Sequence, residues 1–90
     1  MALFILTYGY NETDQRAARR EEHLAYLNTL AEQGSLAAAG PYDDLSGGLI
    51  IYRAQDQAAA EALLAGDPYT IADVTKDRWL RAWRMTVGSL

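Results

Sequence analysis

Apolar residues recur with two different periods along this chain, and the change of period divides it into short elements. Some runs are rich in strand-forming residues, as in ALFILTY near the start and GLIIYRA in the middle. Two other runs repeat their apolar residues at helical spacing. The pattern predicts strands over residues 2–8, 35–41, 48–54 and 78–87, and helices over residues 15–33 and 57–65.

Capping and breaking residues mark the ends of the predicted helices. Thr13 or Asp14 is placed to cap the first helix, and Gly34 follows it as a residue suited to the left-handed position after a helix. Asp56 is placed to cap the second helix. Residues 67–77 then form a connection with room for one helical turn.

The predicted order is β-α-β-β-α-β, the ferredoxin-like arrangement of the α+β class, with an antiparallel sheet and both helices on one face. The other face has no helix to cover it. In the last strand Trp79, Trp83, Met85 and Val87 alternate on one side, while Leu80 lies on the other. A bare apolar sheet is too large a patch for a soluble monomer. We therefore expect two sheets to pair face to face as a homodimeric α+β barrel, and the sequence leaves open a higher oligomer.

Length and charge narrow the function classes. Residues 1–90 are enough for one domain with a thin core. The formal net charge of −4 argues against nucleic acid as the main partner, because phosphate binding needs a basic surface. The apolar N-terminal run is too short to span a bilayer and lacks the marks of a signal peptide, so we expect a cytoplasmic protein without membrane association. Cysteine is absent, which excludes disulfides and thiolate chemistry.

Polar residues interrupt the apolar face of the first predicted helix. At 100° per residue, one face carries Ala17, Leu24, Leu27, Leu30 and Ala31. Arg16, Arg20 and His23 fall in the same sector, toward its N-terminal half. Charge that points at a sheet is costly unless a partner or a pocket receives it. This end of the helix therefore indicates a cavity, which an anionic or oxygen-rich ligand would fill.

Two interpretations apply to the candidate pair His23 and Asp67. A single histidine at the edge of an apolar stripe is commonly structural, and Asp67 followed by Pro68 makes a good helix cap. Alternatively, the carboxylate orients the imidazole for proton transfer, and one carboxylate oxygen can cap while the other faces a neighbour. With one histidine and no cysteine, we expect no metal site, although Asp43 and Asp44 together could hold a metal weakly. No nucleotide-binding or serine-hydrolase motif occurs.

The ordered set of short motifs resembles the YCII-related (YciI-like) family over nearly the whole chain. Its marks are Arg20 before His23-Leu24, then Gly40-Pro41, then Gly48, and then Asp67-Pro68-Tyr69. The resemblance implies a dimeric α+β barrel with an active site formed by His23 and Asp67. It also implies relatives with diverse chemistry, among them one that removes chloride from a chlorinated hydroxyhydroquinone.

The sequence supports two main functional hypotheses. The first is an enzyme without a cofactor, in which His23 and Asp67 carry out acid–base isomerisation or elimination on a small cyclic or phenolic metabolite. The substrate-binding residues would be Tyr8, Arg20, Gly40, Pro41 and Tyr69. The alternative is a non-catalytic ligand-binding or regulatory dimer, and a cofactor-independent monooxygenase is a third possibility. A His23–Asp67 separation within about 3.5 Å around one cavity would favour the enzyme.

Overall fold

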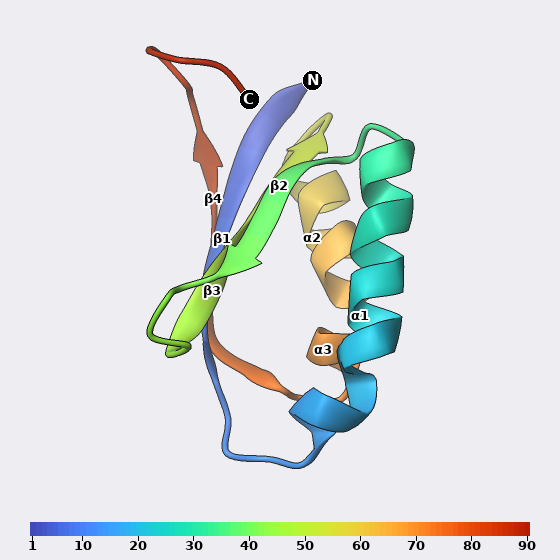
Figure 1. Ribbon diagram of the computed structural model, residues 1–90. Helices are drawn as coiled ribbons and strands as arrows, with labels where there is room; N and C mark the ends of the chain where they lie inside the picture. Colours follow the sequence, from blue (N-terminus) through green and yellow to red (C-terminus); the bar gives the residue numbers. More distant parts are fainter.

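Four strands form one antiparallel sheet in the computed structural model, which describes residues 1–90, and the helices cover one face of that sheet (Figure 1). The strands are β1 (Ala2–Tyr10), β2 (Leu36–Pro41), β3 (Gly47–Ala54) and β4 (Thr75–Trp83), and the helices are α1 (Gln15–Glu32), α2 (Gln57–Ala65) and α3 (Pro68–Ile71). The strand order across the sheet is β2-β3-β1-β4. The predicted α+β class and β-α-β-β-α-β order are therefore confirmed.

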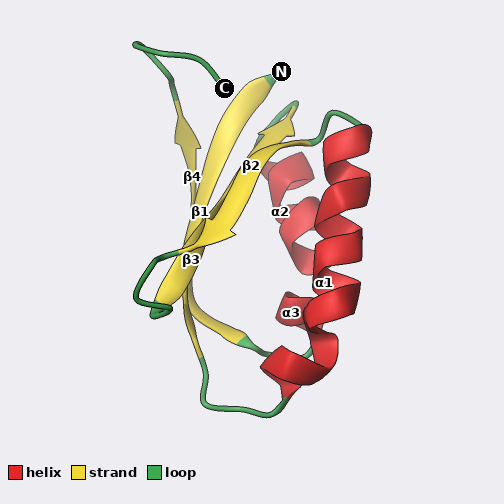
Figure 2. Ribbon diagram, viewed as in Figure 1, coloured by secondary structure: helices red, strands yellow, loops and turns green.

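The core lies between the sheet and the helices (Figure 2). Side chains alternate between the two faces of a strand, so each strand offers every second residue to the helices. Register places Phe4 beside Tyr52 and Leu6 beside Ile50 on the helix-facing side. The core cluster consists of Phe4, Leu6, Tyr8, Leu27, Leu30, Leu36, Ile50, Tyr52, Ala54 and Ala60. One atom in it is unsatisfied, because the buried hydroxyl of Tyr52 has no hydrogen-bond partner.

Helix α1 is rotated relative to the prediction. Its buried residues are His23, Leu27 and Leu30, which form a narrow stripe, whereas Ala17, Leu24 and Ala31 are exposed. The predicted face was centred too far toward the Leu24 flank. The opposite flank faces α2, where the Tyr26 hydroxyl donates a hydrogen bond to the Leu63 carbonyl oxygen at 2.8 Å. The sequence does not reveal this contact with α2.

The start of α1 also differs in detail from the prediction. Asp14 occupies the capping position, but its side chain makes no capping hydrogen bond. The Thr13 hydroxyl instead accepts a hydrogen bond from the Gln15 backbone N–H at 3.2 Å. The predicted caps of the other two helices are both present. Asp56 accepts from the Ala59 N–H, and Asp67 accepts from the Tyr69 N–H, each at 2.9 Å.

The prediction for the last strand was wrong at both ends. β4 begins at Thr75, within the predicted connection, because β1 continues to Tyr10 and pairs with it there. β4 ends at Trp83, so Met85 and Val87 lie beyond the sheet. The single helical turn expected in the connection is α3. The other three strands match their predicted ranges to within two residues at each end.

The second face of the sheet carries no helix, as the ribbon shows (Figure 2), and its residues are mostly apolar, with Arg53 and Arg81 among them. Register places Leu3 opposite Trp83 and Ile5 opposite Ile51 on this face. Trp79 shares it and is 59% exposed, and Trp83 is 38% exposed. We call this surface, formed by Leu3, Ile5, Leu49, Ile51, Trp79 and Trp83, the open sheet face.

Candidate active site

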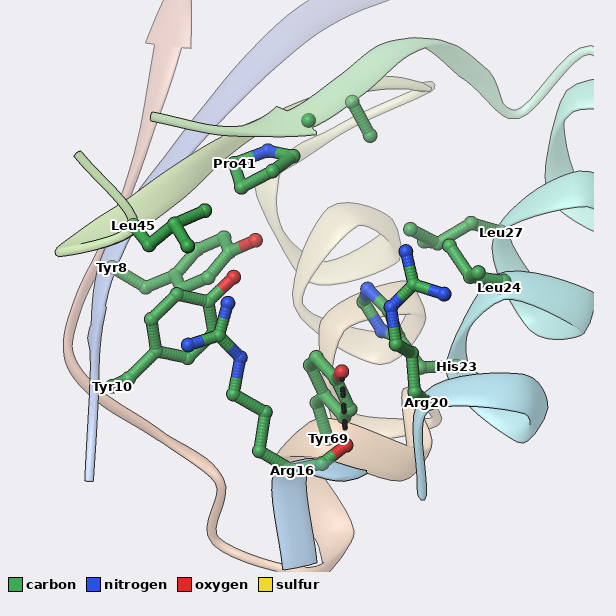
Figure 3. Close-up of a pocket in the computed structure, with 12 residues that line it drawn as sticks. Tyr8, Tyr10, Arg16, Arg20, His23, Leu24, Leu27, Pro41, Leu45 and Tyr69 are labelled. Carbon is green, nitrogen blue, oxygen red and sulfur yellow. Dashed lines mark hydrogen bonds between the residues drawn. The ribbon is translucent and has the colours of Figure 1, made fainter. Parts of the chain in front are cut away.

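A pocket of about 360 Å³ opens where the N-terminal half of α1 faces the C-terminal ends of β1 and β2 (Figure 3). Its wall combines tyrosine rings and aliphatic side chains with two arginines and one imidazole. The lining residues are Tyr8, Tyr10, Arg16, Arg20, His23, Leu24, Leu27, Ala39, Gly40, Pro41, Leu45 and Tyr69. A cavity of this size and mixed lining suits a small molecule.

His23 and Asp67 meet at one edge of this pocket. His23 Nδ1 lies 2.7 Å from Asp67 Oδ1, although the two residues are 44 positions apart in the chain. His23 is 6% exposed and Asp67 is 2% exposed, so the contact is shielded from water. A carboxylate accepts hydrogen bonds, so Nδ1 carries the proton and donates it. The second ring nitrogen, Nε2, makes no hydrogen bond within the chain and is available to a ligand in the pocket.

One oxygen of Asp67 performs two tasks. Oδ1 accepts the Tyr69 backbone N–H at 2.9 Å, which caps α3, and it accepts the His23 contact at 2.7 Å. Pro68 follows at the first helical position, where its missing N–H has no cost. The start of α3 therefore holds the carboxylate in place, and the carboxylate holds the imidazole. Capping and histidine binding share one oxygen, whereas the sequence analysis divided them between the two oxygens.

The ring of Tyr69 fixes the plane of the imidazole. The two rings are stacked with centroids 3.8 Å apart and planes 4° from parallel. The Tyr69 hydroxyl donates to the Arg16 carbonyl oxygen at 3.2 Å, which ties α3 to the first turns of α1. Burial raises the pKa of Tyr69, so the hydroxyl stays protonated and remains a donor. With its hydroxyl engaged in this way, Tyr69 orients His23.

The positive charges of the pocket have no carboxylate partner. Arg16 places its guanidinium over the ring of Tyr10, 3.7 Å from the centroid, which is a cation–π contact. Arg20 follows one helical turn later and makes no salt bridge. Arg19, between them, faces away and pairs with Glu22 at 3.2 Å. No acidic side chain lines the pocket.

Tyr8 brings a neutral hydroxyl to the pocket wall. Its ring meets Tyr10 edge to face, with centroids 5.5 Å apart. Burial is the largest cause that raises the pKa of Tyr8 above its ordinary value, and neighbouring Tyr10 and Asp67 act in the same direction. The phenol is therefore a hydrogen-bond donor at neutral pH. Gly48 lies against it, and a Cβ at Gly48 would collide with the Tyr8 ring.

The turn between β2 and β3, residues 42–46, closes one side of the pocket through Leu45. Leu45 adopts the left-handed backbone conformation, with φ of 61°, and is exposed. Asp44 stabilises the turn, because its Oδ1 accepts from the Ser46 N–H at 2.9 Å and from the Ser46 hydroxyl at 2.7 Å. These bonds lower the pKa of Asp44. The Asp44 carboxylate is thus engaged in the turn, and neither Asp43 nor Asp44 belongs to a cluster able to hold a metal.

Family comparison agrees with the motif resemblance. The sequence profile of the YCII-related domain matches residues 1–84. The chain belongs to the YCII-related family. The matching solved structures include 5-chloro-2-hydroxyhydroquinone dehydrochlorinase (TftG) from Burkholderia phenoliruptrix, in complex with 2,5-dihydroxybenzoquinone. The TM-score is 0.78 at 22% sequence identity, over 91% of this chain and 93% of that chain. No curated protein matches the sequence significantly.

In this YCII-related domain, the structure brings six of the residues selected from the sequence onto one pocket wall: Tyr8, Arg20, His23, Gly40, Pro41 and Tyr69. Asp67 lies behind His23 and does not line the pocket. Tyr8 and Tyr69 are both buried in this wall. Sequence reasoning placed Arg16 beside the cavity without giving it a substrate-binding role, and it did not select the other lining residues: Tyr10, Leu24, Leu27, Ala39 and Leu45.

The sequence carries signals that place Tyr10 and Arg16 beside residues selected for the site. Tyr10 is two positions after Tyr8 and therefore shares its strand face. Arg16 precedes Arg20 by four residues, which places both on one side of the helix.

None of the helices combines the length and the apolarity needed to cross a bilayer.

Proposed function

We propose that this YCII-related protein is a small enzyme that works without a cofactor, with His23 as its general acid and base and Asp67 as the residue that orients it. The observation that carries the proposal is the 2.7 Å contact between His23 and Asp67 beside a pocket into which Nε2 is free to act. A base oriented by a buried carboxylate at hydrogen-bond distance is the minimum equipment for proton transfer.

The proposed reaction begins with removal of an acidic proton from the bound substrate by Nε2. The electron pair of the broken C–H bond forms a C=C bond as the C=O π bond of a neighbouring carbonyl breaks, and the carbonyl oxygen becomes negative. Arg20 and the neutral hydroxyl of Tyr8 stabilise that oxygen, as fixed donors do where charge develops. Asp67 stabilises the imidazolium that forms. The imidazolium then returns the proton at another carbon, giving isomerisation, or the electron pair expels a leaving group, giving elimination.

The substrate class in this proposal is a small cyclic or phenolic compound. The pocket volume of about 360 Å³ and the tyrosine walls suit one ring. The similar structure from Burkholderia phenoliruptrix is a dehydrochlorinase with 2,5-dihydroxybenzoquinone bound. At 22% identity that likeness establishes the fold, so elimination from a ring remains part of the proposal.

A homodimer is the second part of the proposal. The open sheet face exposes Trp79 and Trp83, while Arg81 covers the Trp79 ring at 3.5 Å. Pairing with a second copy would bury this face as a dimeric α+β barrel. The mass in solution, measured by light scattering at micromolar concentration, tests it, and a monomeric mass refutes it.

Replacement of His23 tests the catalytic proposal directly. Chlorinated and unchlorinated hydroxyhydroquinones are supplied, and chloride release and deuterium uptake from D2O are followed. His23→Ala should lower turnover by about 10²–10⁴-fold, the usual contribution of general acid–base catalysis. Tyr26→Phe is the matched control, because Tyr26 lies on the same helix and contacts α2 instead of the pocket. Turnover equal in His23→Ala and Tyr26→Phe would remove His23 from the mechanism, and no turnover in the unmodified protein would leave the non-catalytic binding module as the function.

A further inference from the structure

We propose that Arg16 and Arg20 form a two-arginine anion subsite, which selects ring compounds carrying a permanent anionic oxygen group, a carboxylate or an ionised enol. This inference rests on the proposed function in that it names the substrate class of the same pocket. It adds a binding role for Arg16, and it assigns Arg20 to the ground-state charge of the substrate as well as to the oxygen that becomes negative during reaction.

The first step in the argument is the charge balance of the site. Arg16 and Arg20 contribute two positive charges and Asp67 contributes one negative charge, so the site is positive whatever the protonation of His23. The whole chain, in contrast, has a formal net charge of −4. A neutral phenol would leave the excess positive charge of the site unbalanced, whereas a monoanionic ring compensates it.

The second step is the placement of the two guanidinium groups. Residues four apart on a helix lie on one side, about one turn from each other. Figure 3 shows the Arg16 guanidinium beside the Tyr10 ring and the Arg20 guanidinium on the His23 side of the pocket. A ligand between them can present its anionic group to the arginines while its ring carbons face Nε2 of His23.

The third step is that the Arg16 side chain is already held in place before a ligand binds. The Arg16 guanidinium is restrained by its position over the Tyr10 ring, 3.7 Å from the centroid. A freely solvated surface arginine lacks this restraint. Guanidinium groups suit planar oxygen anions because their donors match both oxygens of a carboxylate. The pre-ordered Arg16 therefore loses little side-chain freedom when it binds such a group.

The test compares two ligands that differ by one carboxylate, 2,5-dihydroxybenzoate and hydroquinone, by isothermal titration calorimetry on the full chain. The acid should bind at least about tenfold more tightly, since a hydrogen bond to a charged group contributes about 1.5–3 kcal/mol and 1.4 kcal/mol is tenfold. Arg16→Met and Arg20→Met should each remove about tenfold of the acid's affinity and leave hydroquinone unchanged. 2,5-Dihydroxybenzoquinone, tested in parallel, distinguishes an ionised enol from a carboxylate as the preferred group.

Arg19→Met is the matched control, since it removes the same charge from the same helix at a residue paired with Glu22 outside the pocket. Equal affinity for acid and hydroquinone, no measurable binding of the acid at millimolar concentration, or equal losses in the Arg16, Arg19 and Arg20 variants would overturn the inference. Turnover and ligand preference are measured separately, so the two proposals can fail independently. If His23→Ala loses turnover but the unmodified protein does not prefer the acid over hydroquinone, the anion subsite alone is refuted. If the unmodified protein prefers the acid but shows no turnover, the enzyme alone is refuted.

Discussion

Replacement of Asp67 should destabilise the fold more than replacement of any other capping residue, because one oxygen of Asp67 satisfies two donors. Asp67→Ala leaves the Tyr69 N–H without its cap, which costs about 1 kcal/mol. It also leaves the Nδ1–H of His23 buried without an acceptor, which costs about 1–3 kcal/mol more. The expected loss in the free energy of unfolding is therefore about 2–4 kcal/mol.

The measurement is thermal and urea denaturation followed by circular dichroism. For a domain of this size, 1 kcal/mol shifts Tm by about 4–8 °C, so Asp67→Ala should melt roughly 10–25 °C lower. Asp67→Asn keeps an oxygen acceptor for both donors and should lose about 1 kcal/mol or less. It should nevertheless impair turnover strongly, because a neutral amide does not stabilise an imidazolium as a carboxylate does.

Asp56→Ala provides the matched control. Asp56 caps α2 through the Ala59 N–H at 2.9 Å and has no histidine partner, so its loss should cost only the capping contribution of about 1 kcal/mol. The difference between the two alanine variants then measures the His23 contact. Equal destabilisation by Asp67→Ala and Asp56→Ala would refute the reasoning, since the histidine contact would contribute nothing to stability.

Three other predictions follow from the core and the sheet. Tyr52→Phe removes a buried hydroxyl without a partner and should leave the free energy of unfolding unchanged or raise it by up to about 1 kcal/mol, measured by urea denaturation; a loss above that would contradict it. Burial raises the pKa of both Tyr8 and Tyr52 above the unfolded value near 10, so stability is complete below about pH 10 and falls above it by up to about 1.4 kcal/mol per pH unit for each tyrosine. Tyr52→Phe should make that alkaline loss shallower, and an unchanged slope would count against it. Gly47→Ala places a Cβ against the Tyr8 carbonyl oxygen and should cost about 1–3 kcal/mol, whereas Gly40→Ala, with no atom within 4 Å of the added carbon, should not; equal Tm values would refute this.

The fold was accessible from the sequence because each local signal agreed with the others. Strand-forming runs, a glycine in the left-handed position after α1 and aspartate caps before α2 and α3 all favour one element order. The errors concern features that depend on contacts between elements. The Tyr26 hydroxyl of α1 contacts α2, and Thr75 at the early start of β4 pairs with Tyr10. Neither contact has a local sequence signature.

The sequence predicted the catalytic candidates of the site but not the contacts that hold them in place. The family motifs selected His23 and Asp67, and the helical pattern placed His23 beside a cavity. The pattern could not show that Tyr69 stacks on the imidazole, because stacking depends on the short turn of α3. It also did not separate Arg16 from an ordinary solvated arginine, since its distinguishing contact with Tyr10 is made across the pocket.

The turn at residues 42–46 limits the size of the pocket independently of the contact between His23 and Asp67. It closes the pocket through Leu45, yet it makes no contact with the hydrogen bond between His23 and Asp67, which is anchored at the start of α3. Lengthening a surface hairpin costs little, about 0.6 kcal/mol for each doubling of loop length. In the proposed enzyme, a longer hairpin would therefore change the size of ligand that fits without altering the hydrogen bond between His23 and Asp67.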